Sequence, residues 1–194
     1  MKKVLSLLAF FSLIAVGSYA QGVSGGLKLG LNLANQTISN DYVTISPSFR
    51  PSLHAGGYLT LMISNKIGVQ PEVLYSAQGA KMDGQTLKLN YVTVPVLVRF
   101  NITERFNLHL GPQIGMLLSA KAKMESGDDE DVKDQYKGTD IGIAGGLGVD
   151  LPMGLNFGFR FIKGVSNIAG EDVGDTKYKN YNLQLSVGYK LFGK

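Results

Sequence analysis

Residues 181–192 read YNLQLSVGYKLF, in which apolar and polar side chains alternate from Tyr181 to Leu191. A period of two is typical of a β-strand with one apolar and one polar face. Seven further segments show a similar alternation, so the sequence predicts eight strands, at residues 26–34, 54–63, 67–78, 91–100, 106–118, 140–151, 155–162 and 181–192. Leu, Val, Phe and Tyr dominate one face of most of these segments, and Gly, Asn, Gln and Ser are frequent on the other.

The connections between these segments differ in length in a regular way. Long polar loops are predicted at residues 35–51, 79–90, 119–139 and 163–180, and short turns at residues 64–66, 101–105 and 152–154. This alternation is typical of outer-membrane barrels, which have long loops outside the cell and short turns in the periplasm. With an even number of strands, both chain ends fall on the periplasmic side. The sequence therefore predicts an all-β protein, an eight-stranded antiparallel up-and-down transmembrane β-barrel with both termini periplasmic.

Alternation alone does not decide which face is inside. A soluble, lipocalin-like barrel would have the apolar set inside and the polar set in water. However, eight strands enclose a narrow lumen that side chains fill. The glycine-rich set fits such a lumen, whereas the bulky Leu, Val, Phe and Tyr set does not. We therefore expect the bulky set to face lipid.

The first twenty residues have the features of an export signal. Lys2 and Lys3 precede an apolar run at residues 4–16, and Ser18 and Ala20 are small residues before a cleavage position ahead of Gln21. The run is shorter than the roughly 20 residues of a spanning helix, so a retained helical anchor is the less favoured alternative. We expect residues 1–20 to be a signal peptide, residues 21–194 to be the barrel domain, and the protein to lie in the outer membrane of a Gram-negative-type bacterium.

The amino-acid composition excludes several classes of function. The chain has no cysteine, which excludes disulfides, cysteine-ligated metals and thiol catalysis. Its formal net charge is only +4, and two of the positive charges belong to the predicted signal peptide. We therefore expect no nucleic acid partner. Outer-membrane lipid is the expected surrounding, and no cofactor is expected.

Short motifs in a fixed order run through the predicted barrel. They are GLNLA (30–34), QPEVLYS (70–76), YVTVPVL (91–97), GPQIG (111–115) and LSAK (118–121). In order and spacing they resemble the PorT-like family of outer-membrane β-barrel proteins of the Bacteroidota, over nearly the whole predicted mature chain. The resemblance implies an eight-stranded outer-membrane barrel without catalytic residues. It also implies a link to protein secretion for the member that gave the family its name.

Ionisable residues occur on the face predicted to line the lumen. They are Lys28, His54, Glu72, Arg99, His109, Asp140, Asp150 and Arg160. Because buried charges must be paired or solvated, we expect them to form a structural polar network, with a proton or ion path as the alternative. Glu72 and Arg160 lie about equally far from their short turns. Glu72 is therefore expected to pair with Arg160 or Arg99.

The same residues argue against a catalytic or metal site. The only two histidines, His54 and His109, are expected at different heights in the lumen, which is unsuitable for a shared metal. Neither is on the lipid face, where a lipid hydrolase would need a Ser–His pair. The third loop carries Glu125, Asp128, Asp129, Glu130, Asp131 and Asp134. These carboxylates lack the alternating spacing of a calcium loop, so we expect a solvated loop rather than a calcium site.

Two further sets of residues have positional meaning. The aromatic residues near predicted strand ends suit interfacial girdles; they are Tyr75, Tyr91, Phe100, Phe106, Tyr181 and Tyr189. Pro71, Pro95 and Pro112 lie inside predicted strands, where proline lacks the N–H that the ladder needs. We expect the prolines to cluster in the periplasmic half of the wall, either as local bulges or as a weakened seam.

These observations favour a non-enzymatic outer-membrane barrel whose extracellular loops serve surface interaction or envelope integrity. The alternative is an accessory subunit of a secretion or transport assembly, in which the barrel docks against other envelope proteins.

Overall fold

The computed structural model describes residues 22–40, 44–45, 47–82, 84–124, 129–170 and 176–193. The predicted signal peptide at residues 1–20 lies outside the described residues. Within the described ranges, no helix is long and apolar enough to cross a membrane.

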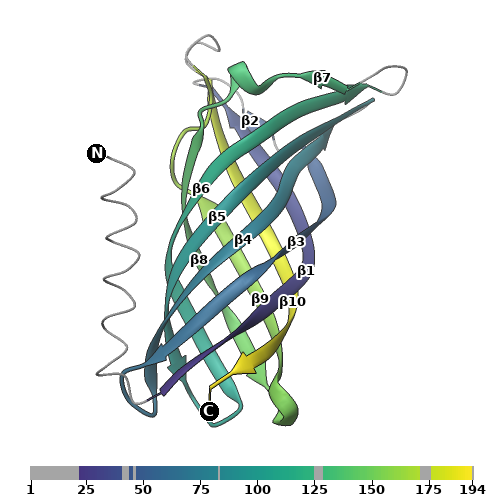
Figure 1. Ribbon diagram of the computed structural model, residues 1–194. Helices are drawn as coiled ribbons and strands as arrows, with labels where there is room; N and C mark the ends of the chain where they lie inside the picture. Colours follow the sequence, from purple (N-terminus) through teal and green to yellow (C-terminus); the bar gives the residue numbers. More distant parts are fainter. Residues whose placement is uncertain are drawn as a thin grey trace, which may run out of the picture.

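Eight long antiparallel strands form a closed ring (Figure 1). They are β1 (Gly22–Ser39), β3 (Ser48–Met62), β4 (Ile67–Met82), β5 (Gln85–Asn101), β6 (Phe106–Met124), β8 (Thr139–Asp150), β9 (Leu155–Gly164) and β10 (Lys177–Phe192). Each pairs with the next in this order, and β10 pairs with β1, so that Leu31 lies opposite Leu185. The predicted eight-stranded all-β barrel is therefore confirmed.

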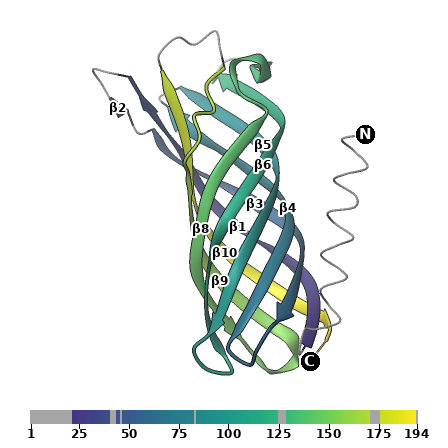
Figure 2. The ribbon, with the colours of Figure 1, turned by 90° about the vertical axis from the view of Figure 1, so that its left-hand side faces the viewer.

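The remaining elements are short and lie at the ends of the barrel. The strands β2 (Thr44–Ile45) and β7 (Asp129–Asp131) pair with β1 and β6 at the loop end. The 3₁₀ turns are η2 (Lys133–Gln135), next to β7, and η3 (Pro152–Gly154), between β8 and β9. Figures 1 and 2 show the strands tilted around the barrel axis, with the start of β1 and the end of β10 at the short-turn end.

The bulky apolar side chains face outward along most of the barrel. On β1, Leu29 is 65% exposed, whereas the neighbouring Lys28 is buried and Asn32 is 0% exposed. On β9, Phe159 and Phe161 are exposed on either side of the buried Arg160. The prediction that the bulky set points away from the lumen is therefore confirmed, and the steric argument gives the reason.

The prediction of a long second loop at residues 79–90 is wrong. The ladder between β4 and β5 continues through this segment to the pair Met82 and Gln85, and Gly84 takes up the tight turn with φ of +72°. Gly79 also has a positive φ, and a Cβ there would lie 2.1 Å from the carbonyl oxygen of Leu87. The strands are long because their outer parts have packing partners inside the barrel.

In the parts of the strands nearest the loop end, the apolar residues change from the outward face to the lumen face. On β5, Val96 and Val98 point outward. Nearer the loop end of the same strand, Leu89 and Tyr91 point inward and are fully buried. Lys88, between Leu87 and Leu89, is on the outward side. Tyr91 is therefore not part of an interfacial girdle, as the sequence predicted, but a lumen residue. The outer part of the wall has apolar side chains inside and lysines outside, like a soluble barrel.

The three prolines interrupt three successive ladders. The β3–β4 ladder lacks regular pairing opposite Pro71, the β4–β5 ladder opposite Pro95, and the β5–β6 ladder opposite Pro112. On its other side each proline is paired, and Pro71 lies opposite Val96. The prolines thus form one patch on β4, β5 and β6, closer to the short turns than to the loop ends. The predicted clustering is confirmed.

Candidate functional site

The centre of the lumen holds a buried carboxylate with two cationic partners. Glu72 on β4 is 1% exposed. One of its oxygens accepts a hydrogen bond of 2.7 Å from Lys28 on β1, and both accept bonds of 2.9 Å from Arg160 on β9. Gln70 donates a further bond of 2.7 Å to it, and His109 contacts the Arg160 guanidinium at 3.3 Å. The pairing of Glu72 with Arg160 agrees with the sequence prediction, whereas Lys28 was not foreseen as a partner.

Arg99, the other predicted partner of Glu72, lies closer to the short-turn end. It forms an ion pair with Asp150 on β8, and Asn107 donates a hydrogen bond of 3.1 Å to the same carboxylate. This group borders a polar cavity of about 250 Å³, whose lining includes Glu104 and Lys190.

His54 belongs to a third group, nearer the loop end than Glu72. Its Nδ1 donates a hydrogen bond of 2.8 Å to the side-chain oxygen of Asn32, which also accepts one of 3.0 Å from Gln184. The structure therefore keeps His54 apart from the Arg160 contact of His109. Within the described residues, no three of His, Asp or Glu are grouped in a way that could hold a metal ion.

Asp140, the last of the eight predicted residues, lies further toward the loops. Its carboxylate accepts hydrogen bonds of 2.9 Å from Asn180 and 3.2 Å from Ser166. Asn180 also donates a bond of 3.2 Å to the Tyr91 hydroxyl. The eight residues thus occupy four groups along the lumen instead of converging on one point.

An apolar cluster fills the lumen beyond this last group. Its buried members are Leu89, Tyr91, Leu117, Ala120, Val132 and Ile168. Val132 comes from the segment after β7 and Ile168 from the connection between β9 and β10, so two loops fold inward over the barrel. The backbone N–H of Val132 donates a hydrogen bond of 3.0 Å to the carbonyl oxygen of Ala120 on β6. The expectation that the third loop is wholly solvated is wrong for this part of it.

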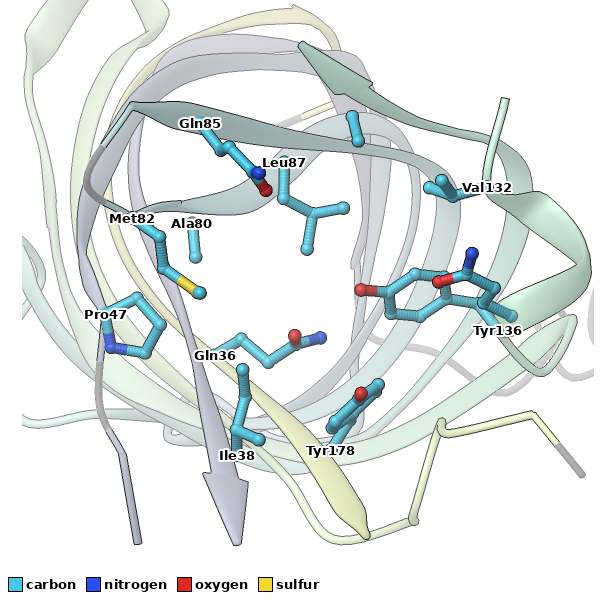
Figure 3. A pocket seen from close by; sticks show the side chains of 12 residues that line it. Gln36, Ile38, Pro47, Ala80, Met82, Gln85, Leu87, Val132, Tyr136 and Tyr178 are labelled. Carbon is cyan, nitrogen blue, oxygen red and sulfur yellow. The ribbon is translucent and has the colours of Figure 1, made fainter. Parts of the chain in front are cut away.

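A cavity of about 200 Å³ lies at the loop end, beside this cluster (Figure 3). It is lined by uncharged residues only: Gln36, Ile38, Pro47, Ala80, Met82, Gln85, Leu87, Ala122, Val132, Gln135, Tyr136 and Tyr178. The Tyr136 hydroxyl and the Gln85 side chain point into the space in Figure 3. This cavity could not be predicted from a pattern in which residues 79–90 form a loop. The phase change at Leu87 and Leu89 was the signal that could have revealed it.

An ion pair outside the cavity connects β7 to β5. Lys88 on β5 donates hydrogen bonds of 2.9 and 3.0 Å to the carboxylate of Asp129 on β7. This bonding lowers the pKa of Asp129. Burial raises the pKa of Tyr136, so its phenol is neutral at physiological pH and can donate a hydrogen bond.

Comparisons with known proteins agree with this architecture. The family model described as "Outer membrane protein beta-barrel domain" matches residues 19–170. The crystal structure of Ail, the attachment invasion locus protein of Yersinia pestis, is similar with a TM-score of 0.53 at 17% identity, covering 87% of this chain and 98% of Ail. Neisserial surface protein A (NspA) has a TM-score of 0.53 at 11% identity, covering 84% of this chain and 96% of that protein. A comparison with curated protein sequences gives no significant match.

Proposed function

Because the chain belongs to the family of outer membrane protein β-barrel domains, we propose that it is a non-conducting, non-enzymatic barrel whose loop end serves surface interaction or envelope integrity. The observation that carries the proposal is the filling of the lumen. The group around Glu72 occupies its centre, and the apolar cluster occupies its outer part.

The apolar cluster also argues against the alternative of a proton or ion path. A path for protons or ions needs polar groups or water along its whole length, because a charge in apolar surroundings is very costly. The polar groups from Asp150 to Asp140 reach only as far as Tyr91, Leu89 and their neighbours. In this proposal the polar groups of the lumen stabilise the barrel and conduct nothing.

The proposed orientation has the loop end outside the cell and both termini in the periplasm. It rests on the predicted signal peptide at residues 1–20 and on the general position of long loops in such barrels. The names of Ail, an attachment invasion locus protein, and NspA, a surface protein, favour a surface role for this architecture. The order of motifs from GLNLA to LSAK supports a place among the PorT-like members of the family.

Conductance measurements in planar lipid bilayers test this proposal. We expect no current steps from the folded protein, with a general porin as the positive control. In cells, loss of the gene should increase sensitivity to detergent. The wild-type gene should restore resistance, and a gene with residues 129–137 replaced by a Gly-Ser linker should not. Regular current steps from the wild-type protein would overturn the proposal.

The proline patch favours a second candidate, an accessory subunit of a secretion or transport assembly. Interrupted ladders leave backbone groups on the wall that a protein partner could pair with. A photo-crosslinking residue at Val96, between Pro71 and Pro112, should then capture another envelope protein in cells. The same residue at Val187 on β10 is the matched control, since the two side chains are 38% and 39% exposed. Capture of lipid alone at both positions would exclude this candidate.

A further inference from the structure

We propose that the cavity at the loop end is a binding site for a small, uncharged and mainly apolar molecule that carries a hydroxyl or similar hydrogen-bonding group. The site depends neither on the absence of conductance through the barrel nor on docking against other envelope proteins. This proposal and the proposed function can therefore fail separately.

The walls of the cavity select against ions. Ile38 on β1, Ala80 on β4, Leu87 on β5 and Ala122 on β6 line it with apolar groups. The lysines next to them in sequence, which are Lys81, Lys88, Lys121 and Lys123, alternate with the lining residues and are not part of the lining. An ion entering the cavity would lose its water without gaining a counter-charge, which is unfavourable.

A few polar groups in the lining are free to bind a ligand. Neither the side-chain amides of Gln85 and Gln135 nor the hydroxyls of Tyr136 and Tyr178 make a hydrogen bond to any described residue. The rings of Tyr136 and Tyr178 lie 5.8 Å apart at an angle of 38° and form one wall. A mainly apolar cavity with a few convergent polar groups is the usual form of a small-molecule site.

The shape of the site indicates binding rather than passage. Leu89, Tyr91 and Leu117 are buried in the apolar cluster that closes the lumen beside the cavity. The volume of about 200 Å³ is below the roughly 300–1,000 Å³ of sites for drug-sized ligands. The size favours a single substituted aromatic ring or a short-chain alcohol.

Fluorine NMR on the folded protein in lipid nanodiscs tests the proposal, with 4-fluorobenzyl alcohol as the neutral probe and 4-fluorobenzoate as its anionic counterpart. Empty nanodiscs correct for partition into lipid. We expect saturable binding of the alcohol and none of the benzoate. Tyr136→Phe, which keeps the ring and removes the hydroxyl, should weaken binding by about two- to tenfold, the effect of one hydrogen bond.

Filling the cavity should abolish binding. Ala122→Phe places a large side chain in the cavity, and Leu118→Phe is its matched control because Leu118 points outward on the same strand. If Ala122→Phe does not fold, Ala80→Leu fills the space from β4. Loss of binding in the filled variant alone supports the site. Absence of saturable binding to the wild type, equal loss in Leu118→Phe, or equal binding of the benzoate would overturn it.

Discussion

At the scale of single residues, Glu72 is the carboxylate that neutralises two buried cations at the centre of the lumen. It is the carboxylate partner of both Lys28 and Arg160, and all three side chains are buried. Removing the negative charge leaves two buried cations without a counter-charge, which is more costly than the ion pairs are worth.

Glu72→Gln should therefore lower the free energy of unfolding by about 3–5 kcal/mol. Denaturant unfolding of the protein in lipid vesicles measures this change. Glu104→Gln makes the same chemical change in the exposed turn between β5 and β6 and should have little effect. Equal losses in the two variants would show that the charge of Glu72 is not what stabilises the lumen.

The sequence predicts one of the two partners of Glu72. Counting residues from the short turns gives relative heights and leaves Arg160 and Arg99 as partners for Glu72, of which the structure has Arg160. Lys28 lies on β1, which is separated from β4 by β3, so its contact runs across the lumen. Alternation assigns a residue to a face but contains no information about distances across the barrel. Counting does predict that His54 and His109 lie at different heights, but it does not show which side chains make contact within each group.

At the scale of elements, the strands are longer than a membrane-spanning pattern suggests. The alternation predicts strands at residues 91–100 and 106–118 because most apolar residues there face one way. Beyond them the apolar residues switch to the lumen, so the same alternation continues with opposite orientation. The lipid-facing pattern ends at this switch, so it predicts a loop where the β4–β5 hairpin continues.

The hydrogen bonds between Lys88 and Asp129 connect β7 to the outer wall and should make the docking of β7 dependent on pH. The pKa of Asp129 is lower in the folded protein than in the unfolded chain. The stabilisation is therefore complete above the ordinary pKa of about 3.9 and is lost as the pH falls through the lowered folded value. Protection of the Val132 amide from hydrogen exchange, corrected for intrinsic rates, should fall in that acidic range.

Two variants separate this ion pair from other effects of acid. Asp129→Asn should reduce the protection of Val132 already at pH 7. Asp131→Asn is the control, because Asp131 accepts a hydrogen bond from the backbone N–H of Lys133 and not from a lysine side chain. Identical pH profiles for the wild type and Asp129→Asn would rule out the role of this pair.

At the scale of the whole molecule, the closed ring predicts resistance to detergent. Every long strand is paired on both sides, so no strand edge is available for stepwise opening. The folded protein should migrate differently in gel electrophoresis when it is not boiled than when it is boiled. One mobility for both samples in mild detergent would contradict a closed barrel.

Orientation in the membrane can be tested because the chain has no cysteine of its own. Gln135→Cys places a thiol in η2 at the loop end, and Ser64→Cys places one in the turn between β3 and β4. A maleimide that cannot cross membranes should label only Gln135→Cys on intact cells, and both variants after the outer membrane is permeabilised. Labelling of only Ser64→Cys on intact cells would reverse the orientation.

The pairing of β10 with β1 sets the order in which the barrel can be made. It joins Gly25 to Phe192, nearly the two ends of the described chain. The backbone hydrogen bonds of β1, which is synthesised first, therefore cannot be completed until β10 has been synthesised. Contacts between such distant residues form slowly and expose strand edges in the meantime. Until β10 is in place, the chain must be kept unfolded by other factors. A truncation that removes β10 would leave the edges of β1 and β9 open, with backbone N–H and C=O groups to which lipid offers no hydrogen bonds.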